Sequence, residues 1–404
     1  MYAKKVTFKG LVIVALILSM PLLRIFNIPL IDYFDEIIGI FSFVYITIRF
    51  FTKKLAHSEK IVFIIIVLLS LIGFLSNYVY GIITSIWVIV FDWVEFTKCL
   101  AVIIAFRNLF KQSDVMAACN YLNPIAKVLM FFAFLCSVIS QFVDIGMTVK
   151  REYGINSFGF IYGNAIQTYF LLTGCMIILF YTLRKKKEKN IYIFMYCVTC
   201  FFTTAIIVWC SIAFLFFFKI YYEKKKQLKI KTLIAVGILS IIIAFYEIEK
   251  YLMNTEAPRA VLLVYGIKTA NRFFPLGAGF GSYGGEMAAR YYSPLYWEYG
   301  FNDRYGLSHT GYGGILNDNY IAMIMAQFGY VGLMLFGTAY YKLFKCLDIK
   351  NNCKKIKPIL MSLFFTIVFS LLVSASSKTY MGVWIHIVLS LFSIIKDEKN
   401  KFEI

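Results

Sequence analysis

The sequence predicts an all-α, polytopic integral membrane protein of about twelve transmembrane helices, with one long outer loop between the ninth and tenth helices. Of the 404 residues, 60% are hydrophobic and only 16% are charged, whereas a soluble domain carries about a quarter charged residues. Apolar runs such as "IVFIIIVLLSLIGFL" recur along the chain, and about 20 apolar residues cross the ~30 Å hydrocarbon core of a bilayer. Short clusters of lysine separate these runs.

The lysine clusters carry most of the net charge of +19 and fix the expected orientation. They lie between apolar runs, which is the pattern of cytoplasmic loops in membrane proteins. This placement argues against a nucleic-acid-binding surface, and no nucleic-acid partner is expected. The clusters are Lys53 with Lys54, 184–189, 223–231 and 350–357.

Threading the chain with every lysine cluster inside gives the expected order of helices. The stretch 190–222 has basic clusters at both ends, so we expect two short helices that turn near "TTAIIVWCS". Both termini are then cytoplasmic, and the loops 145–164 and 249–317 face outward as parts of a single domain, 1–404. The other expected spans are 10–27, 37–52, 60–76, 82–106, 123–144, 165–183, 231–248, 318–341, 358–375 and 379–395.

The loop 249–317 contains the glycine-rich run "FPLGAGFGSYGG", in which Gly279, Gly281 and Gly284 match G-x-G-x-x-G. That fingerprint binds dinucleotides only between a strand and a helix. Here the preceding "LLVYGIKTANRFFP" reads as a helix ended by a proline, and the loop lies where no nicotinamide cofactor is available. We therefore expect the glycines to help a site in two ways. Their backbone N–H groups form an anion-binding nest, and the missing side chains let a bulky lipid-linked substrate approach closely.

Arginine and aromatic side chains are also concentrated in this loop. Four of its six basic residues are arginines, Arg259, Arg272, Arg290 and Arg304, whose planar forks bind phosphate oxygens in pairs. Surface ion pairs with nearby glutamates are the alternative. The stretch "ARYYSPLYWEYGF" is typical of an interfacial aromatic belt and equally of a platform on which sugar rings stack.

Polar residues at the end of the loop precede an expected helix near residue 320. Asp318 or Asn319 is suited to cap that helix. Asp318 is also suited to act as a general base if burial raises its pKa. Within the membrane, Asp92, Glu95 and Lys98 lie on one helix face, where we expect Glu95 and Lys98 to pair for structural reasons rather than to line a cavity.

Three pieces of the sequence, in order, carry a resemblance to a known family. Arg259 precedes the run "PLGAGFGSYG", and the aromatic stretch "RYYSPLYWEYGF" follows. Asn319 then stands nine residues before Gly329, and Gly332 completes a G-x-x-G. Residues 259–332 thus resemble the polymerase and ligase superfamily of bacterial surface polysaccharides, the O-antigen polymerases (Wzy) and O-antigen ligases. "IGFLSN" and "REYGINSFGF" resemble polymerase features more loosely.

The resemblance implies a glycosyltransferase on the outer face of the bacterial cytoplasmic (inner) membrane, without a metal, a nucleotide sugar or another cofactor. The donor is a repeat unit on undecaprenyl pyrophosphate. A hydroxyl of a second lipid-linked unit attacks the anomeric carbon, and undecaprenyl pyrophosphate leaves. The product is O-antigen or capsular polysaccharide, and membrane lipid and a chain-length regulator are the implied partners.

The resemblance also implies roles for individual residues. Arg259 neutralises the departing pyrophosphate, Asp318 deprotonates or orients the acceptor hydroxyl, and His309 is the alternative base. The further implied contacts to substrate or pyrophosphate are Arg151, Arg272, Arg290, Gly277, Gly279, Gly281, Tyr291, Tyr292 and Asn319.

Three other functions stay open. An O-antigen ligase has histidine where this chain has Asp318, so the departure favours a polymerase. A flippase for lipid-linked sugars would line a central cavity with charge and have short outer loops, whereas charge and glycine are concentrated here in one long loop. A structural partner of the polysaccharide machinery is the third alternative.

Overall fold

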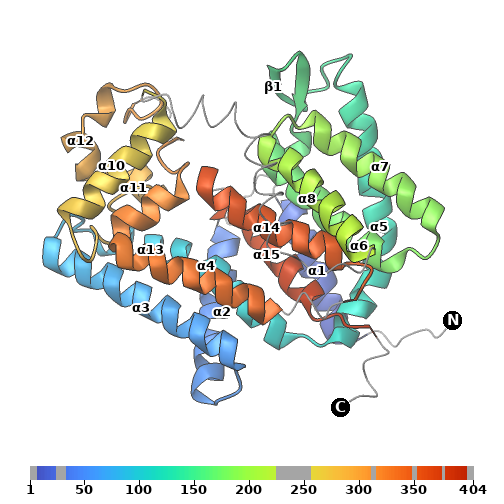
Figure 1. The fold of residues 1–404 in the computed structure, drawn as a ribbon, viewed down its shortest axis with the longest axis horizontal. Helices are drawn as coiled ribbons and strands as arrows, with labels where there is room; N and C mark the ends of the chain where they lie inside the picture. Colours follow the sequence, from blue (N-terminus) through green and yellow to red (C-terminus); the bar gives the residue numbers. More distant parts are fainter. Residues whose placement is uncertain are drawn as a thin grey trace.

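The computed structural model describes residues 7–23, 33–223, 256–310, 315–347, 353–374 and 378–397. These residues are mostly helical, as Figure 1 shows. Four helices are long and apolar enough to cross a bilayer, and others are apolar but shorter. The four long helices are α3 (His57–Tyr80), α5 (Gln112–Ile139), α6 (Ala165–Thr182) and α13 (Tyr320–Leu347). The prediction of a mostly helical protein with helices long and apolar enough to cross a bilayer is confirmed, while the number of spans and the membrane itself stay predictions.

The helices form two packed groups joined by a central pair (Figure 1). In the first group, α2 (Phe34–Phe51) packs on α4 (Ile86–Leu109), and α3 packs on α13. In the second, α5 and α6 pack together with α7 (Lys186–Phe202), and α8 (Ile206–Glu223) packs on α14 (Lys357–Val373). Between them, α15 (Tyr380–Ser393) contacts α4 and α6, and α1 (Phe8–Leu23) contacts α5 and α15.

The division of the stretch 190–222 into two helices is confirmed. Helix α7 ends at Phe202 and α8 begins at Ile206. The intervening turn includes Thr204, whose φ of 54° is left-handed and breaks the helical path. The expected span 231–248 lies outside the described residues.

A small β-hairpin departs from the all-α prediction. Strands β1 (Thr148–Glu152) and β2 (Ile155–Phe158) pair antiparallel, with Glu152 opposite Ile155. The two-residue turn between them, Tyr153–Gly154, has φ values of 52° and 75°. Positive φ at both positions is what a two-residue hairpin turn requires. A short helical turn, η3 (Phe160–Tyr162), follows and leads into α6.

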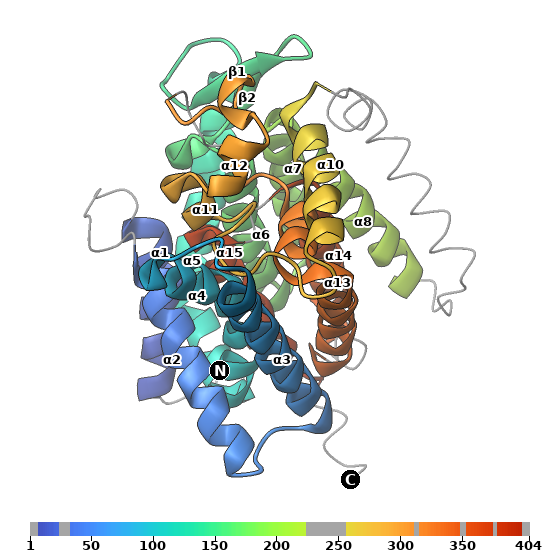
Figure 2. The same cartoon turned by 90° about the vertical axis from the view of Figure 1, so that its left-hand side faces the viewer.

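Residues 256–310, which we call the cap, form a compact unit at one end of the first helix group (Figure 2). The cap contains α10 (Pro258–Arg272), α11 (Glu286–Tyr291), α12 (Pro294–Glu298) and η5 (Phe301–Asp303). Its own apolar core includes Leu262, Tyr283, Tyr296 and Phe301, all fully buried. The cap makes up most of the described part of the predicted loop 249–317, and it joins the helices mainly where α10 packs on α13 and α11 on α4.

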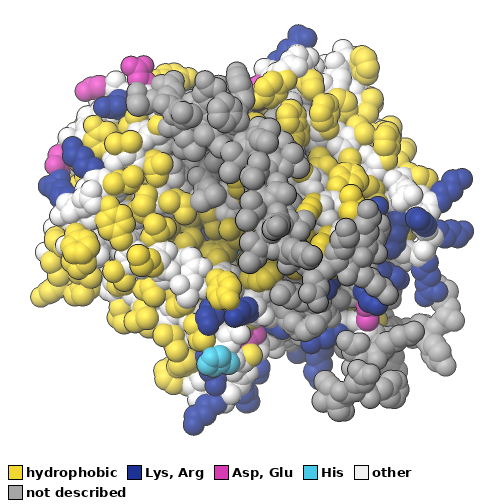
Figure 3. Space-filling view, in the orientation of Figure 1, with side chains coloured by type: hydrophobic (Ala, Val, Ile, Leu, Met, Phe, Trp, Pro, Cys, Tyr) yellow, Lys and Arg dark blue, Asp and Glu magenta, His cyan; other side chains and the backbone are white. Residues whose placement is uncertain are grey.

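The cap lies at the opposite end of α3 from the basic turn between α2 and α3 (Figures 1 and 2). That turn contains Lys53 and Lys54. On the face shown in Figure 3, hydrophobic side chains cover much of the surface over the helices, and many of the Lys and Arg side chains gather along the lower and right-hand edges. This separation agrees with the prediction that the loop and the lysine clusters lie on different sides of a membrane, although the orientation itself stays a prediction.

Candidate active site and substrate-binding residues

Two residues singled out from the sequence, Arg259 and Asp318, contact one another at the junction of the cap and α13. Arg259 lies in the first turn of α10, and Asp318 stands just before α13. The Nε and Nη2 atoms of Arg259 donate to Oδ2 of Asp318 at 2.9 and 2.5 Å. Both side chains are about 30% exposed, at 29% and 28%. The pair is therefore half-buried and reachable from solvent.

The local environment of Asp318 suits a proton acceptor. Burial raises the pKa of its carboxyl, and the ion pair with Arg259 only partly offsets this. Both hydrogen bonds go to Oδ2, and Oδ1 accepts none within the described part of the chain. A carboxylate with one oxygen held and the other open can orient or deprotonate a hydroxyl.

Asn319 was expected either to contact substrate or to cap a helix, and the structure gives it the capping role. Its Oδ1 accepts from the backbone N–H of Ala322 at 3.0 Å, which caps the N-terminus of α13. Its Nδ2 donates to the backbone oxygen of Arg259 at 3.3 Å, and the side chain is buried. Asn319 is thus the helix cap, and it ties α13 to α10 so that Asp318 faces Arg259.

The glycine run is packed against the helices instead of forming an open nest. Gly277, Gly279 and Gly281 have left-handed φ values of 80°, 84° and 72°. Five successive amides of the run donate to protein acceptors. They are Gly277 to Phe273 O, Ala278 to Ala326 O, Gly279 to Gln327 O, Phe280 to Asn77 Oδ1 and Gly281 to Asp92 Oδ2, at 2.8–2.9 Å. The anion-nest interpretation of these glycines is therefore wrong for this conformation, because their N–H groups are already bonded.

The acceptors on α13 exist because that helix is kinked at Gly329. Its φ and ψ of 65° and −170° are not helical. A Cβ at this residue would overlap the backbone oxygen of Pro275, so only glycine fits. The kink leaves the carbonyls of Ala326 and Gln327 to accept from the glycine run. The glycine run and the segment around Gly329 are thus packed against each other.

The other predicted arginines are not gathered around Asp318. Arg272 forms an ion pair with Glu298, and Arg290 pairs with Glu286 one helical turn away at 2.5 Å. Both arginines are exposed on the cap, so the alternative of surface ion pairs holds for them. Arg151 lies on the exposed face of β1, which Figure 1 shows on the other side of the molecule from the cap.

The predicted aromatic and histidine residues lie on α11, α12 and the segment that follows. Tyr291 is half exposed, but Tyr292 is buried and its hydroxyl donates to Leu307 O at 3.0 Å, so it is not open to substrate. His309 is exposed, and its ring packs on Tyr292 and Trp297. The structure therefore places His309 with the aromatic side chains of the cap.

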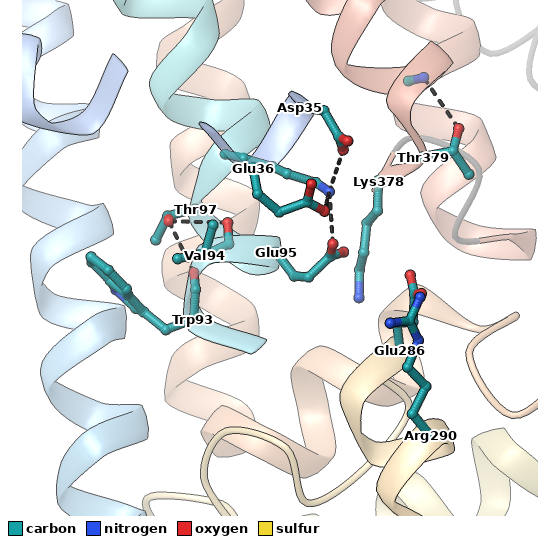
Figure 4. Close-up of polar contacts among 12 residues, drawn as sticks. Asp35, Glu36, Trp93, Val94, Glu95, Thr97, Glu286, Arg290, Lys378 and Thr379 are labelled. Atoms are coloured by element: carbon teal, nitrogen blue, oxygen red, sulfur yellow. Dashed lines mark hydrogen bonds and ion pairs between the residues drawn. The ribbon is translucent and has the colours of Figure 1, made fainter. Parts of the chain in front are cut away.

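Lys98 is the centre of a buried ionic cluster between α2 and α4, which Figure 4 shows. Its ammonium binds Asp35 at 2.6 Å, Glu36 at 3.0 Å and Glu95 at 2.7 Å. The predicted Glu95–Lys98 pair is confirmed, and the two additional carboxylates come from α2. Gly39 allows the close approach, because a Cβ there would lie 2.5 Å from Cβ of Lys98.

Asp92 lies on the same helix but contacts the cap. Its Oδ2 accepts from the Gly281 N–H and from Nε2 of Gln327, both at 2.8 Å, and its Oδ1 has no partner among the described residues. Gln327 also donates to Tyr283 O at 2.8 Å. Asp92 and Gln327 together hold the glycine run against α4 and α13.

Sequence reasoning missed Lys378, which lies just before α15. Its ammonium is buried, 2.6 Å from Met323 Sδ and 4.6 Å from the centre of the Tyr320 ring. Figure 4 shows it pointing between Glu95 and the Glu286–Arg290 pair. A lone lysine after the sequence SASS gives no local signal of this kind. Only the fold brings Lys378 close to Met323 and Tyr320 of α13.

Searches against protein-family models, curated proteins and solved structures returned no match for this chain. In the described ranges, no cluster of three or more His, Cys, Asp or Glu side chains is arranged to hold a metal ion. The functional interpretation therefore depends on the geometry and on the residues of this chain.

Proposed function

We propose that this protein is a polymerase of lipid-pyrophosphate-linked oligosaccharide repeat units, acting on the outer face of a bacterial cytoplasmic membrane. The Arg259–Asp318 pair carries this proposal. The two residues are 59 positions apart in the sequence and belong to separate motifs. They nevertheless form two hydrogen bonds with each other at a half-buried site that solvent can reach. The chemistry of the pair suits transfer of a glycosyl group from a phosphate leaving group.

The proposed reaction makes one bond and breaks one. An acceptor hydroxyl attacks the anomeric carbon of the donor sugar, and the bond from that carbon to the pyrophosphate oxygen breaks. The hydroxyl proton passes to Asp318, and undecaprenyl pyrophosphate leaves with the electron pair. Arg259 supplies positive charge where negative charge develops, which is usually the largest single contribution to such catalysis.

Asp318 also bears on the choice between polymerase and ligase. The ligase pattern has histidine at this position, and the only histidine of the cap, His309, packs on aromatic rings instead. A carboxylate held by arginine replaces the imidazole as the nearby base. This substitution supports the polymerase, and the ligase is the alternative within the same superfamily.

A flippase for lipid-linked sugars is the second candidate, and the Lys98 cluster favours it. Ionisable side chains inside a helical bundle often mark a transport path. However, the ammonium of Lys98 is bonded to all three carboxylates around it, which is what a cross-link between α2 and α4 requires. We therefore place the cluster in the scaffold and the chemistry at the cap.

The test begins with a strain that lacks the protein. Surface polysaccharide on a gel should collapse from a ladder to a single exported and attached repeat unit. Complete loss of surface glycan would indicate a ligase or flippase, and the side of the membrane that holds the stranded lipid-linked sugar separates these two. An unchanged ladder would refute the proposal.

Point variants then test the site. Arg259→Ala and Asp318→Asn should each abolish the ladder while the protein stays in the membrane at its normal level. Arg304→Ala is the matched control, because this exposed cap arginine lies over the Tyr265 ring, whereas Asp318 pairs with Arg259. A full ladder from both Arg259→Ala and Asp318→Asn would show that the site is wrong.

A further inference from the structure

Trp297 is a large aromatic side chain on a water-facing part of the molecule. It is 54% exposed on α12. Both ribbon views place α12 at the end of the cap remote from the basic turn between α2 and α3, beyond the end of α3 (Figures 1 and 2). An interfacial aromatic belt would lie at the level of the helix ends, so this position argues against a membrane anchor. An exposed aromatic patch away from lipid marks a binding surface.

Other rings hold the indole in place. Tyr292 and His309 lie 4.9 and 5.6 Å from it between ring centroids. Tyr292 is itself fixed by the hydrogen bond from its hydroxyl to Leu307 O. Its backbone has a left-handed φ of 50°, which a non-glycine residue adopts only when its surroundings impose it. The cap thus presents Trp297 and His309 on a rigid base.

The surroundings of these rings are polar and include two carboxylates, Glu298 and Asp303, and the charge of Asp303 acts on Tyr292. Asn302 Oδ1 accepts from the backbone N–H of His309 at 3.2 Å and from Ser308 Oγ at 3.4 Å, and Thr310 lies beside Ser308. The neighbouring charge of Glu298 is neutralised by Arg272. Flat aromatic faces rimmed by amide and hydroxyl groups match the C–H faces and hydroxyls of a sugar ring, whereas a phosphate would need unpaired cations.

The segment that carries His309 also approaches the start of α10, where Arg259 lies. A Cβ on Gly306 would lie 3.4 Å from Cγ of Pro258, the residue before Arg259, so the segment that carries His309 contacts the start of α10.

We propose that Trp297 and His309, supported by Tyr292, form a stacking platform for a pyranose ring of the glycan. The platform rests on the proposed function in one respect: the glycan is the chain that the polymerase extends. On this proposal His309 binds sugar instead of acting as the alternative base, and Trp297 sets how well the chain is held between transfers.

Binding without catalysis tests the platform directly. The probe is a set of oligosaccharides cleaved from the host's own surface polysaccharide, titrated by calorimetry against the full-length protein in lipid nanodiscs. Trp297→Tyr keeps a flat ring, whereas Trp297→Leu keeps an apolar side chain without one. We expect Leu to weaken binding by about tenfold and Tyr by less than about threefold, the range of one aromatic contact.

Trp87 provides the matched control. It is 70% exposed in the first turn of α4, near the start of the expected span 82–106, where an interfacial anchor belongs. Trp87→Leu should leave oligosaccharide affinity unchanged. Thermal unfolding of each variant identifies any that is misfolded. If Trp297→Leu is misfolded, Trp297→Tyr remains as the informative substitution.

The outcomes separate the platform from the polymerase. Equal affinity of wild-type and Trp297→Leu proteins, or no oligosaccharide binding by wild type, would refute the platform while the deletion strain still tests the polymerase. Binding that depends on a flat ring, together with an unchanged ladder in the deletion strain, would support the platform and refute the polymerase. In cells, loss of the ring should shorten the polymer without reducing it to one unit.

Discussion

Replacing Gly279 by alanine should destabilise the protein, because this glycine is needed for packing. Its φ is 84°, and a Cβ there would lie 2.7 Å from Cγ and Oδ1 of Asn77 and 2.8 Å from its backbone nitrogen. The backbone of α3 cannot move aside as a flexible side chain could. Alanine must therefore displace either Asn77 or the glycine run.

The expected loss follows from the contacts involved. The left-handed backbone alone costs a non-glycine residue about 1–2 kcal/mol. Asn77 also exchanges two hydrogen bonds with Phe280, at 2.8 and 2.9 Å, and these are buried. Each buried group left unpaired costs about 1–3 kcal/mol. The free energy of unfolding should fall by about 3–5 kcal/mol for Gly279→Ala.

Gly300 isolates the backbone contribution. It has a φ of 65° in the same cap, and no atom lies within 4 Å of the point that a Cβ would occupy there. Gly300→Ala should lower stability by about 1–2 kcal/mol, so its shift in the thermal unfolding midpoint should be smaller than that of Gly279→Ala. If Gly279→Ala unfolded like wild type but lost polymerisation, the glycine would serve substrate approach and a packing role would be refuted.

Four further outcomes are expected. Lys98→Ala should reduce the protein in membrane immunoblots, because removing one partner of a buried ion pair costs about 3–5 kcal/mol; normal abundance with lost polymer would assign Lys98 to the reaction. Asn319→Ala should lower the unfolding midpoint modestly, since a helix cap contributes about 1 kcal/mol, and an unchanged midpoint would dispute the cap. Burial raises the pKa of Asp318, and only the ionised carboxylate accepts a proton. The rate of polymerisation in vesicles should therefore fall on acidification at a pH above the usual aspartate pKa of about 3.9, and a rate unchanged down to that pH would exclude Asp318 as base. Arg290→Ala should leave the ladder intact, as its guanidinium is exposed and paired with Glu286; a lost ladder would return Arg290 to the pyrophosphate site.

The helices were predictable because their signals are local. The length of an apolar run decides whether it can span a bilayer, and lysine placement divides the stretch 190–222 into α7 and α8. The hairpin at 148–158 was missed because its strands are short and only partly apolar. Its one sequence signal is the pair Tyr153–Gly154, which suits a two-residue turn.

The candidate site was predictable only in part. Arg259 and Asp318 each stand out in the sequence by residue type and position. Their contact, however, depends on how α10 packs on α13. The role of the glycine run could not be predicted, since its partners Asn77, Asp92 and Gln327 come from three distant helices. Closely spaced glycines indicate that another group approaches the backbone closely, but they do not show whether that group is a bound phosphate or a packed helix.

The packed glycine run explains how Arg259 and Asp318 are held. They lie on two segments, and a catalytic pair needs its geometry fixed by the surrounding structure. The run follows α10 and bonds to α13 through Ala278 and Gly279, and to α3 and α4 through Asn77 and Asp92. Substitutions along the run should therefore reduce polymer through the loss of this support. If only activity were measured, these glycines would be assigned wrongly to the active site. A residue belongs to the chemistry only if its replacement lowers activity while the unfolding midpoint stays unchanged.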